Sequence, residues 1–230
     1  MLDPKAVPGA QIGGMGTLMD HSPSETTLLL ERLRAGGHGT LAELFGRYRD
    51  RLRRMVELRM DPRLQARLDP SDVLQEAFLD LSQDLDAYLR DPKLTPFLWL
   101  RLHVGRRLTI LHRHHLGTRM RGAGLEVSLY RDALPEASSA ALAAMLLGGH
   151  TSPTRAARRA ERLLRVQEAM NRLEPMDREA LALRHFEQLS RAEAAQVLGI
   201  SEAAAAKRYV RALKRLEELL AAMPGGLEGL

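Results

Sequence analysis

The sequence contains no cysteine, and this absence removes several classes of chemistry at once. Disulfide frameworks, thiolate metal sites and cysteine nucleophiles all need a thiol, so none of them is available to the chain. A chain without disulfides fits a reducing compartment, and we expect a cytoplasmic protein. Long apolar runs are missing too: no stretch approaches the roughly 18 uncharged apolar residues of a membrane-spanning helix, so we expect no membrane partner.

Aromatic residues are also scarce, at 4% of the 230 residues. Alternating runs of β-branched or aromatic side chains, which would indicate strands, do not persist anywhere in the chain. Apolar residues recur instead at helical spacing, as in Leu41, Leu44 and Phe45. This periodicity predicts an all-α fold.

The helical pattern falls into two blocks separated by a stretch rich in glycine and proline. Breaks at Gly36-Gly37, Asp61-Pro62 and Asp91-Pro92 divide the first block into four helices, and one further short helix is expected near residues 140–147. The expected organisation is a flexible leader (1–23), a four-helix domain (24–117), a linker (118–153), a second small helical domain (154–223) and a flexible tail (224–230). The leader lacks the apolar run and cleavage site of a signal peptide.

Residues 190–215 read as a short helix, a glycine turn and a second helix rich in alanine and basic residues. Ala195 is small enough for close helix crossing, and Gly199 can adopt the positive φ of a tight turn. Ser201 can cap the second helix, with Glu202 in its first turn. The pattern predicts a helix-turn-helix that binds duplex DNA.

The second helix of this motif carries regularly spaced basic residues. Lys207, Arg208, Arg211, Lys214 and Arg215 occupy its polar positions, which suits phosphate contacts. Its first residues, where base edges would be reached, include Ala203 and Ala204, so direct readout is expected to be sparse. A plain basic surface helix would show the same spacing, and the turn that precedes it favours the DNA interpretation.

Charge changes sign between the third and fourth expected helices. Residues 69–86 carry six acids and no Lys or Arg, whereas residues 101–121 carry six arginines and four histidines. An acidic protein-docking face beside a basic nucleic-acid face would use both signs, although solvated faces of a helical bundle would give the same pattern.

Metal and acid/base sites are weaker interpretations of these helices. Asp72, Glu76 and Asp80 share one helical stripe, but no convergent histidine, phosphate loop or second carboxylate helix accompanies them. Only His112 and His115 of the histidine cluster share a helix face. We therefore expect no metal, no cofactor and no enzymatic activity. Trp99, the only tryptophan, suits either the core or a surface on which an unpaired base stacks.

Three segments together resemble the extracytoplasmic-function (ECF) sigma factors of the sigma-70 family. The run that begins at Asp69 is similar to the family's "D-x-x-D-L-x-Q-E-x-F" helix, with Val73 in place of the usual leucine. Residues 97–115 look like the helix that recognises and opens the −10 promoter element. Residues 173–190, leading into the turn motif, look like the start of the domain that reads the −35 element.

The resemblance implies a promoter-specificity factor that binds the RNA polymerase core, through its β′ subunit, and promoter DNA. An anti-sigma factor or another regulator is a further implied partner. The implied polymerase contacts are Asp69, Asp72, Gln75, Glu76 and Phe78. The implied −10 contacts are Arg90, Lys93, Trp99, Arg101, Arg106, Arg107 and Arg113. The implied −35 contacts are Ser201, Glu202, Ala203, Ala204, Lys207, Arg208, Arg211 and Lys214.

Two alternatives belong to other functional classes. A stand-alone repressor or activator would use the same turn motif but would not need the acidic third helix. A hydrolase or nuclease would need a nucleophile, a metal cluster or a phosphate loop, and the sequence offers no convincing example of any of these.

Overall fold

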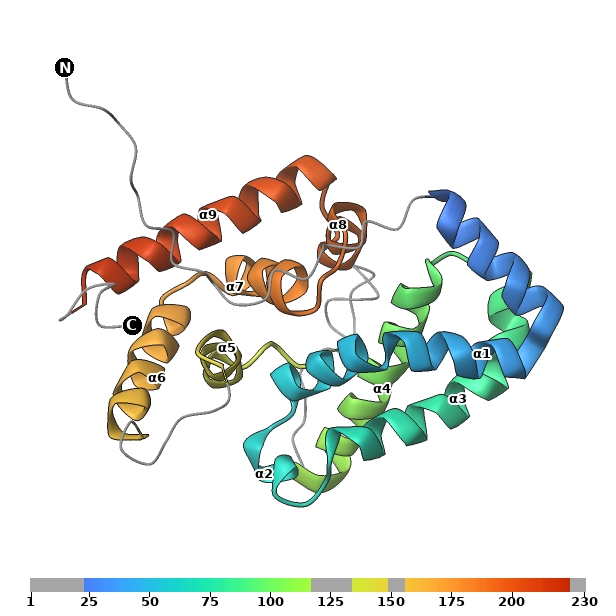
Figure 1. The fold of residues 1–230 in the computed structure, drawn as a ribbon, viewed down its shortest axis with the longest axis horizontal. Helices are drawn as coiled ribbons and strands as arrows, with labels where there is room; N and C mark the ends of the chain where they lie inside the picture. Colours follow the sequence, from blue (N-terminus) through green and yellow to red (C-terminus); the bar gives the residue numbers. More distant parts are fainter. Residues whose placement is uncertain (1–22, 117–133, 149–155, 224–230) are drawn as a thin grey trace.

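The computed structural model describes residues 23–116, 134–148 and 156–223, and all regular structure in these ranges is helical (Figure 1). The prediction of an all-α fold is confirmed. The helices form two groups that lie side by side, α1–α4 and α6–α9, with the short α5 between them (Figure 1). We call them the N-terminal and the C-terminal group. The domain boundaries expected from the sequence stay a prediction.

The N-terminal group consists of three long helices and one short one. Their bounds are α1 Pro23–Arg59, α2 Pro62–Gln65, α3 Pro70–Arg90 and α4 Pro96–Leu116. The expected break at Gly36-Gly37 is present as a kink inside α1, where Gly37 has a φ of 53°. At the start of α3, the Asp69 carboxylate accepts from the Ser71 amide at 2.7 Å, and Asp72 accepts from the Asp69 amide at 2.9 Å. This capping box explains why α3 begins directly after Asp69.

The C-terminal group contains the expected helix-turn-helix. Its elements are α6 Ala156–Asn171, α7 Pro175–Leu181, a π-helical turn Ala182–Phe186, α8 Arg191–Leu198 and α9 Glu202–Ala221. Gly199 ends α8 in the left-handed region with a φ of 67°, as the turn requires. The Ser201 hydroxyl accepts from the Ala204 amide at 3.2 Å and so caps α9, as expected from the sequence.

The helix expected near residues 140–147 is α5, Ser139–Leu146, and the chain around it joins the two groups. The Ser138 amide donates to the carbonyl of Leu58 in α1 at 2.7 Å. Leu134 packs so closely against Gly105 of α4 that a β-carbon there would lie 2.0 Å from its side chain. Leu142 and Ala143 are fully buried, and α5 packs mainly against α6.

One hydrophobic core crosses between the groups. It combines side chains of α1, α3 and α4 with C-terminal residues such as Leu183, Leu189 and Val197. A second cluster places Leu58 of α1 among side chains of α5, α6, α7 and α9. The two groups therefore pack as one body in this structure.

A buried ion-pair network lies in the same interface and centres on Glu187, which is 0% exposed. Arg101 Nε of α4 donates to its carboxylate at 2.7 Å, and Arg59 of α1 pairs with it from the other side and also with Glu179. Arg51 donates to the backbone carbonyls of Glu187 at 3.1 Å and Gln188 at 2.9 Å. Burial alone would raise the pKa of Glu187, but the charges of Arg101 and Arg59 outweigh burial and hold this pKa below its ordinary value.

Replacing Glu187 by Gln would leave Arg59 and Arg101 buried beside an uncharged side chain. We expect the free energy of unfolding at pH 7 to fall by about 3 kcal/mol. Because the folded state lowers the pKa of Glu187, its contribution is complete above the ordinary glutamate pKa and is lost as the pH falls through the lower folded-state pKa. Urea unfolding of both proteins should show a stability gap that is widest at neutral pH and closes in acid.

Glu161→Gln on the exposed side of α6 is the control, and it should leave stability almost unchanged at every pH. A Glu187→Gln variant as stable as the wild type at pH 7 would contradict the proposed importance of this network.

Candidate nucleic-acid interface and docking surface

The start of α9 is open to solvent, as a recognition helix requires. Ser201, Glu202 and Ala203 are exposed, Ala204 is half-buried, and the helix is anchored at Ala205, which is 3% exposed within the core that crosses between the groups. Apart from its cap Ser201 and Glu202, this exposed turn presents methyl groups. The structure therefore places the expected base-reading residues where a groove of DNA could reach them.

The five basic residues of α9 have different partners. Arg211 forks onto the carboxylate of Asp177 in α7 at 2.7 and 2.8 Å, and Arg208 donates to the same carboxylate at 3.0 Å. Arg215 pairs with Glu218 at 3.0 Å. Lys207 and Lys214 are exposed and have no ion-pair partner among the described residues.

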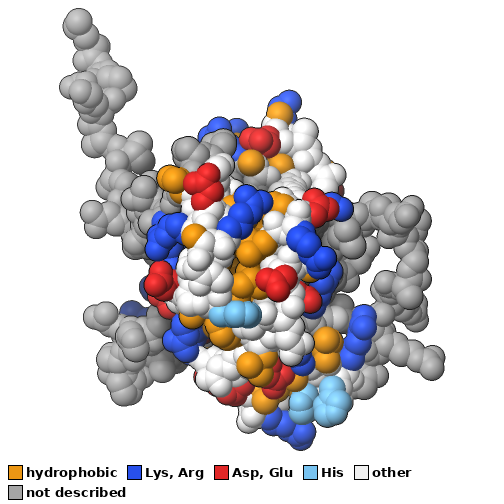
Figure 2. Space-filling model, turned by 90° about the vertical axis from the view of Figure 1, so that its right-hand side faces the viewer, with side chains coloured by type: hydrophobic (Ala, Val, Ile, Leu, Met, Phe, Trp, Pro, Cys, Tyr) orange, Lys and Arg blue, Asp and Glu red, His pale blue; other side chains and the backbone are white. Residues whose placement is uncertain are grey.

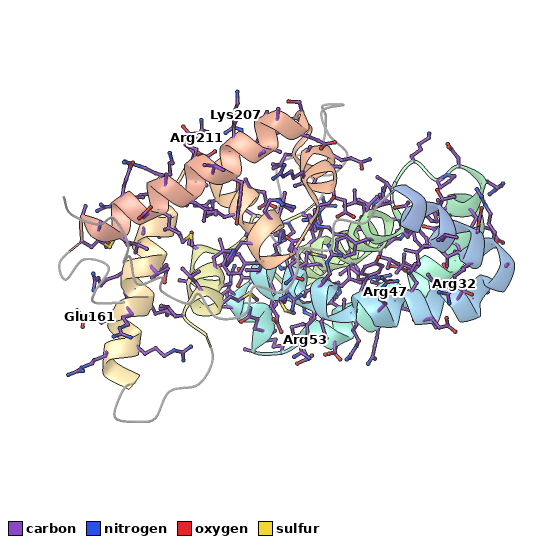
Figure 3. All side chains as sticks on the ribbon, turned by 45° about the horizontal axis from the view of Figure 1, so that its top comes forward. Arg32, Arg47, Arg53, Glu161, Lys207 and Arg211 are labelled. Carbon is purple, nitrogen blue, oxygen red and sulfur yellow. The ribbon has the colours of Figure 1, made fainter. Side chains whose placement is uncertain are left out.

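A shallow groove of about 540 Å³ runs along α9 and is lined by four of these basic residues, Lys207, Arg211, Lys214 and Arg215, and by the half-exposed Val210. Lys207 and Arg211 both extend from the outer side of α9 (Figure 3). The groove is open and basic on its rim, which suits a phosphate backbone better than an enclosed small molecule.

The residues expected to contact the −10 element are divided by the structure. Arg106 and Arg113 are exposed on α4, one on either side of Ile110, which is 49% exposed. Arg90 and Lys93 are exposed at the end of α3 and in the loop that follows, and Lys93 pairs with Asp91 at 3.1 Å.

The other three are turned inward or paired. Trp99 is 5% exposed and stacks on Tyr88 with ring centroids 4.2 Å apart, so the core interpretation of this tryptophan holds in this structure. Arg101 is 2% exposed and is bound to Glu187. Arg107 Nε donates to Asp80 of α3 at 2.9 Å. None of these three side chains is free to contact DNA in this arrangement.

The histidines of α4 separate into buried and exposed ones. Burial lowers the pKa of His103 and of His112, which favours the neutral form of both rings. His112 Nε2 also accepts from the Asp61 amide at 3.4 Å, which requires the neutral ring. His114 and His115 are exposed. Among the residues that the structure describes, no group of three His, Cys, Asp or Glu side chains could hold a metal ion.

The expected docking residues also separate. Asp69, Asp72 and Gln75 are exposed on α3, and the two aspartates cap the helix as described above. Glu76 is half-buried, 3.6 Å from Arg107. Phe78 is half-buried and packs edge-on against Phe45 of α1, with ring centroids 5.1 Å apart, so it belongs mainly to the core.

Leu79 is an exposed apolar residue of α3 that the sequence analysis did not single out. It is 63% exposed on α3, one turn beyond Gln75 and Glu76. Its helical position, four residues after Gln75 and seven after Asp72, was the available signal. A single exposed leucine among acids gives the surface an apolar contact point.

Acidic and basic side chains are interspersed on the end of the molecule that Figure 2 shows, around a strip of hydrophobic side chains. Charge of one sign does not dominate this face. None of the helices in the described ranges is both long enough and apolar enough to span a bilayer.

The fold and the exposed turn motif define a helical protein with a helix-turn-helix in its C-terminal group. Residues 163–216, which run from α6 into α9, match the family profile described as "Sigma-70, region 4". No curated protein matches the chain. A solved structure described as "Structure of CnrH in complex with the cytosolic domain of CnrY" aligns with 23% sequence identity over 85% of this chain and 96% of that chain, with a TM-score of 0.49.

The contrast between Phe78 and Leu79 can be measured without any partner. Phe78→Ala should lower the free energy of unfolding by about 2 kcal/mol because it removes a packed ring. Leu79→Ala should change it by less than about 0.5 kcal/mol because the side chain is mostly in water. Denaturant unfolding of both variants checks this, and equal losses would show that Leu79 is part of the core.

Proposed function

We propose that the chain is a promoter-specificity factor of the sigma-70 kind, which binds the RNA polymerase core and directs initiation by recognising −10 and −35 elements. The observation that carries this proposal is the match of residues 163–216 to sigma-70 region 4. The exposed start of α9 supports it, because the matched segment presents its recognition helix to solvent. Its action is binding rather than catalysis.

In this proposal α9 binds the −35 element from the major groove. Lys207 and Lys214 supply the phosphate contacts, since no carboxylate occupies them among the described residues. Ser201 to Ala204 face the bases, and the alanines limit direct readout. Sequence-dependent DNA shape then contributes more of the discrimination.

The −10 contacts divide into two sets in this proposal. Arg106 and Arg113 on α4, together with Arg90 and Lys93, are exposed and can bind a phosphate backbone without any rearrangement. Arg101 can do so only after the C-terminal group moves away from α4, because it is bound to Glu187, and Arg107 only after it leaves Asp80. Trp99 can stack on an unpaired base only after it leaves Tyr88.

The docking surface of the proposal is the exposed side of α3, formed by Asp72, Gln75, Glu76 and Leu79. Its partner is the polymerase core, with the β′ subunit as the expected contact. Assignment to the ECF subgroup and an anti-sigma partner belong to the same proposal. A stand-alone regulator is the second candidate, because the family match covers the helix-turn-helix segment and leaves the N-terminal group unmatched.

Replacing Leu79 by Arg should abolish retention of the protein on immobilised RNA polymerase core, because a charge would replace the only exposed large apolar side chain of the described α3. The matched control is Leu164→Arg, since Leu164 is equally exposed, at 64%, on α6 at the far side of the molecule (Figure 1). Run-off transcription from a genomic fragment library reports function in parallel.

Retention of the wild type and of Leu164→Arg, with discrete start sites, is the expected outcome. A wild type that shifts duplex DNA but is not retained by polymerase would support the stand-alone regulator instead. Retention of Leu79→Arg would move the docking surface away from α3.

Replacing both Lys207 and Lys214 by Ala should weaken binding to a promoter duplex and flatten its salt dependence. Each lost phosphate contact lowers the magnitude of the log-log salt slope by about 0.9, so the double variant should lose about two. Fluorescence anisotropy over a salt series measures both quantities. The control is Arg32→Ala, which removes an exposed basic residue from α1 and should leave the slope unchanged. An unchanged slope in the double lysine variant would place the DNA contacts elsewhere.

A further inference from the structure

Two of the arginines of α9 are held by one carboxylate. Asp177 lies in the first turn of α7 and is 5% exposed, yet both of its oxygens face α9. One oxygen accepts from Arg211 Nη2 at 2.7 Å and from Arg208 Nη1 at 3.0 Å, and the other accepts from Arg211 Nε at 2.8 Å. This is a bidentate fork with a second arginine added, one of the stronger ion-pair geometries in proteins.

A second acid stands at the solvent side of the same cluster. Glu174, which precedes α7, lies 3.7 Å from Arg211 and 3.9 Å from Arg208 and is 74% exposed. Hydrogen bonds from Arg211 hold the pKa of Asp177 below its ordinary value, so the carboxylate is ionised at neutral pH. Two positive and two negative charges therefore meet at this point of the surface.

The balance of charge in this cluster matters because both arginines are partly exposed to solvent. The side chain of Arg211 is 56% exposed and lines the groove on one face of α9, and that of Arg208 is 30% exposed. Without the two carboxylates, they would add two cations to the unpaired Lys207 and Lys214 on that face. With them, the four-group cluster has no net charge, and any phosphate that approached Arg211 would also approach Asp177.

We propose that Asp177, assisted by Glu174, is a specificity-determining residue that limits how many DNA phosphates α9 can bind by holding Arg208 and Arg211 in ion pairs. The inference rests on the proposed function, because it requires that α9 binds duplex DNA. Its consequence is low affinity for duplexes without a promoter, since non-specific binding comes almost entirely from phosphate contacts. Contacts with bases, and the DNA shape, then carry a larger share of the total binding energy.

The test compares the salt dependence of the wild type and of Asp177→Asn for two duplexes of equal length, a promoter duplex identified by run-off transcription and one of random sequence. Asn keeps the shape of the side chain and one acceptor but removes the charge. We expect a steeper log-log salt slope by about one and a several-fold higher affinity for the random duplex at low salt. The ratio of promoter affinity to random-duplex affinity should fall.

Two further variants separate this role from stability and from net charge. Glu174→Gln changes an exposed residue whose side chain makes no cap hydrogen bond to α7, so it should remain folded and shift the slope in the same direction by a smaller amount. Glu217→Gln makes the same change in net charge at an exposed position of α9 that has no ion-pair partner among the described residues, and it should leave the slope unchanged. Thermal melting of each variant shows whether it is folded.

Each outcome is decisive for one of the two proposals. A folded Asp177→Asn protein with an unchanged or shallower slope overturns the role of Asp177 and leaves the function standing. If Asp177→Asn does not fold, the slope of Glu174→Gln decides in its place. A wild type that binds neither duplex overturns the proposed function, and the role of Asp177 falls with it.

Discussion

The buried carboxylate of Glu187 is the contact on which the arrangement of the two helical groups depends. A carboxylate that is 0% exposed is tolerated only where opposite charge surrounds it, and here Arg59 and Arg101 provide that charge from two different helices. Hydrophobic packing across the same interface is permissive about orientation, whereas three charges must meet at hydrogen-bond distance. The network thereby fixes how α4 faces the C-terminal group, and it keeps Arg101 of α4 out of solvent.

The local part of this architecture could be predicted from the sequence because its causes are local. The turn at Gly199, the cap at Ser201 and the start of α3 at Asp69 each depend on residues within one helical turn. The partner of Arg101 could not be predicted, because Glu187 lies 86 residues away and no periodicity connects them. The basic run at 101–121 and the family resemblance placed Arg101 among the expected DNA contacts.

In α3, too, the sequence did not predict which side chains are exposed. Phe78 and Leu79 are adjacent in the sequence. Phe78 was expected to contact the polymerase because it matches the aromatic position of the family's motif. The structure turns Phe78 toward Phe45 and leaves Leu79 in solvent, because the kinked α1 packs along that side of α3. The number of basic residues on α9 likewise overstates the charge available to DNA, since three of the five already have carboxylate partners.

The interface between the groups is asymmetric in charge. Arg51, Arg59 and Arg101 all belong to the N-terminal group, and the acceptors they find, Glu179, Glu187 and the Gln188 carbonyl, all belong to the C-terminal group. A polypeptide cut between α5 and α6 would therefore not yield two neutral fragments. One fragment would carry an uncovered cationic face and the other the matching anionic face, so electrostatic attraction would favour reassociation of the two fragments.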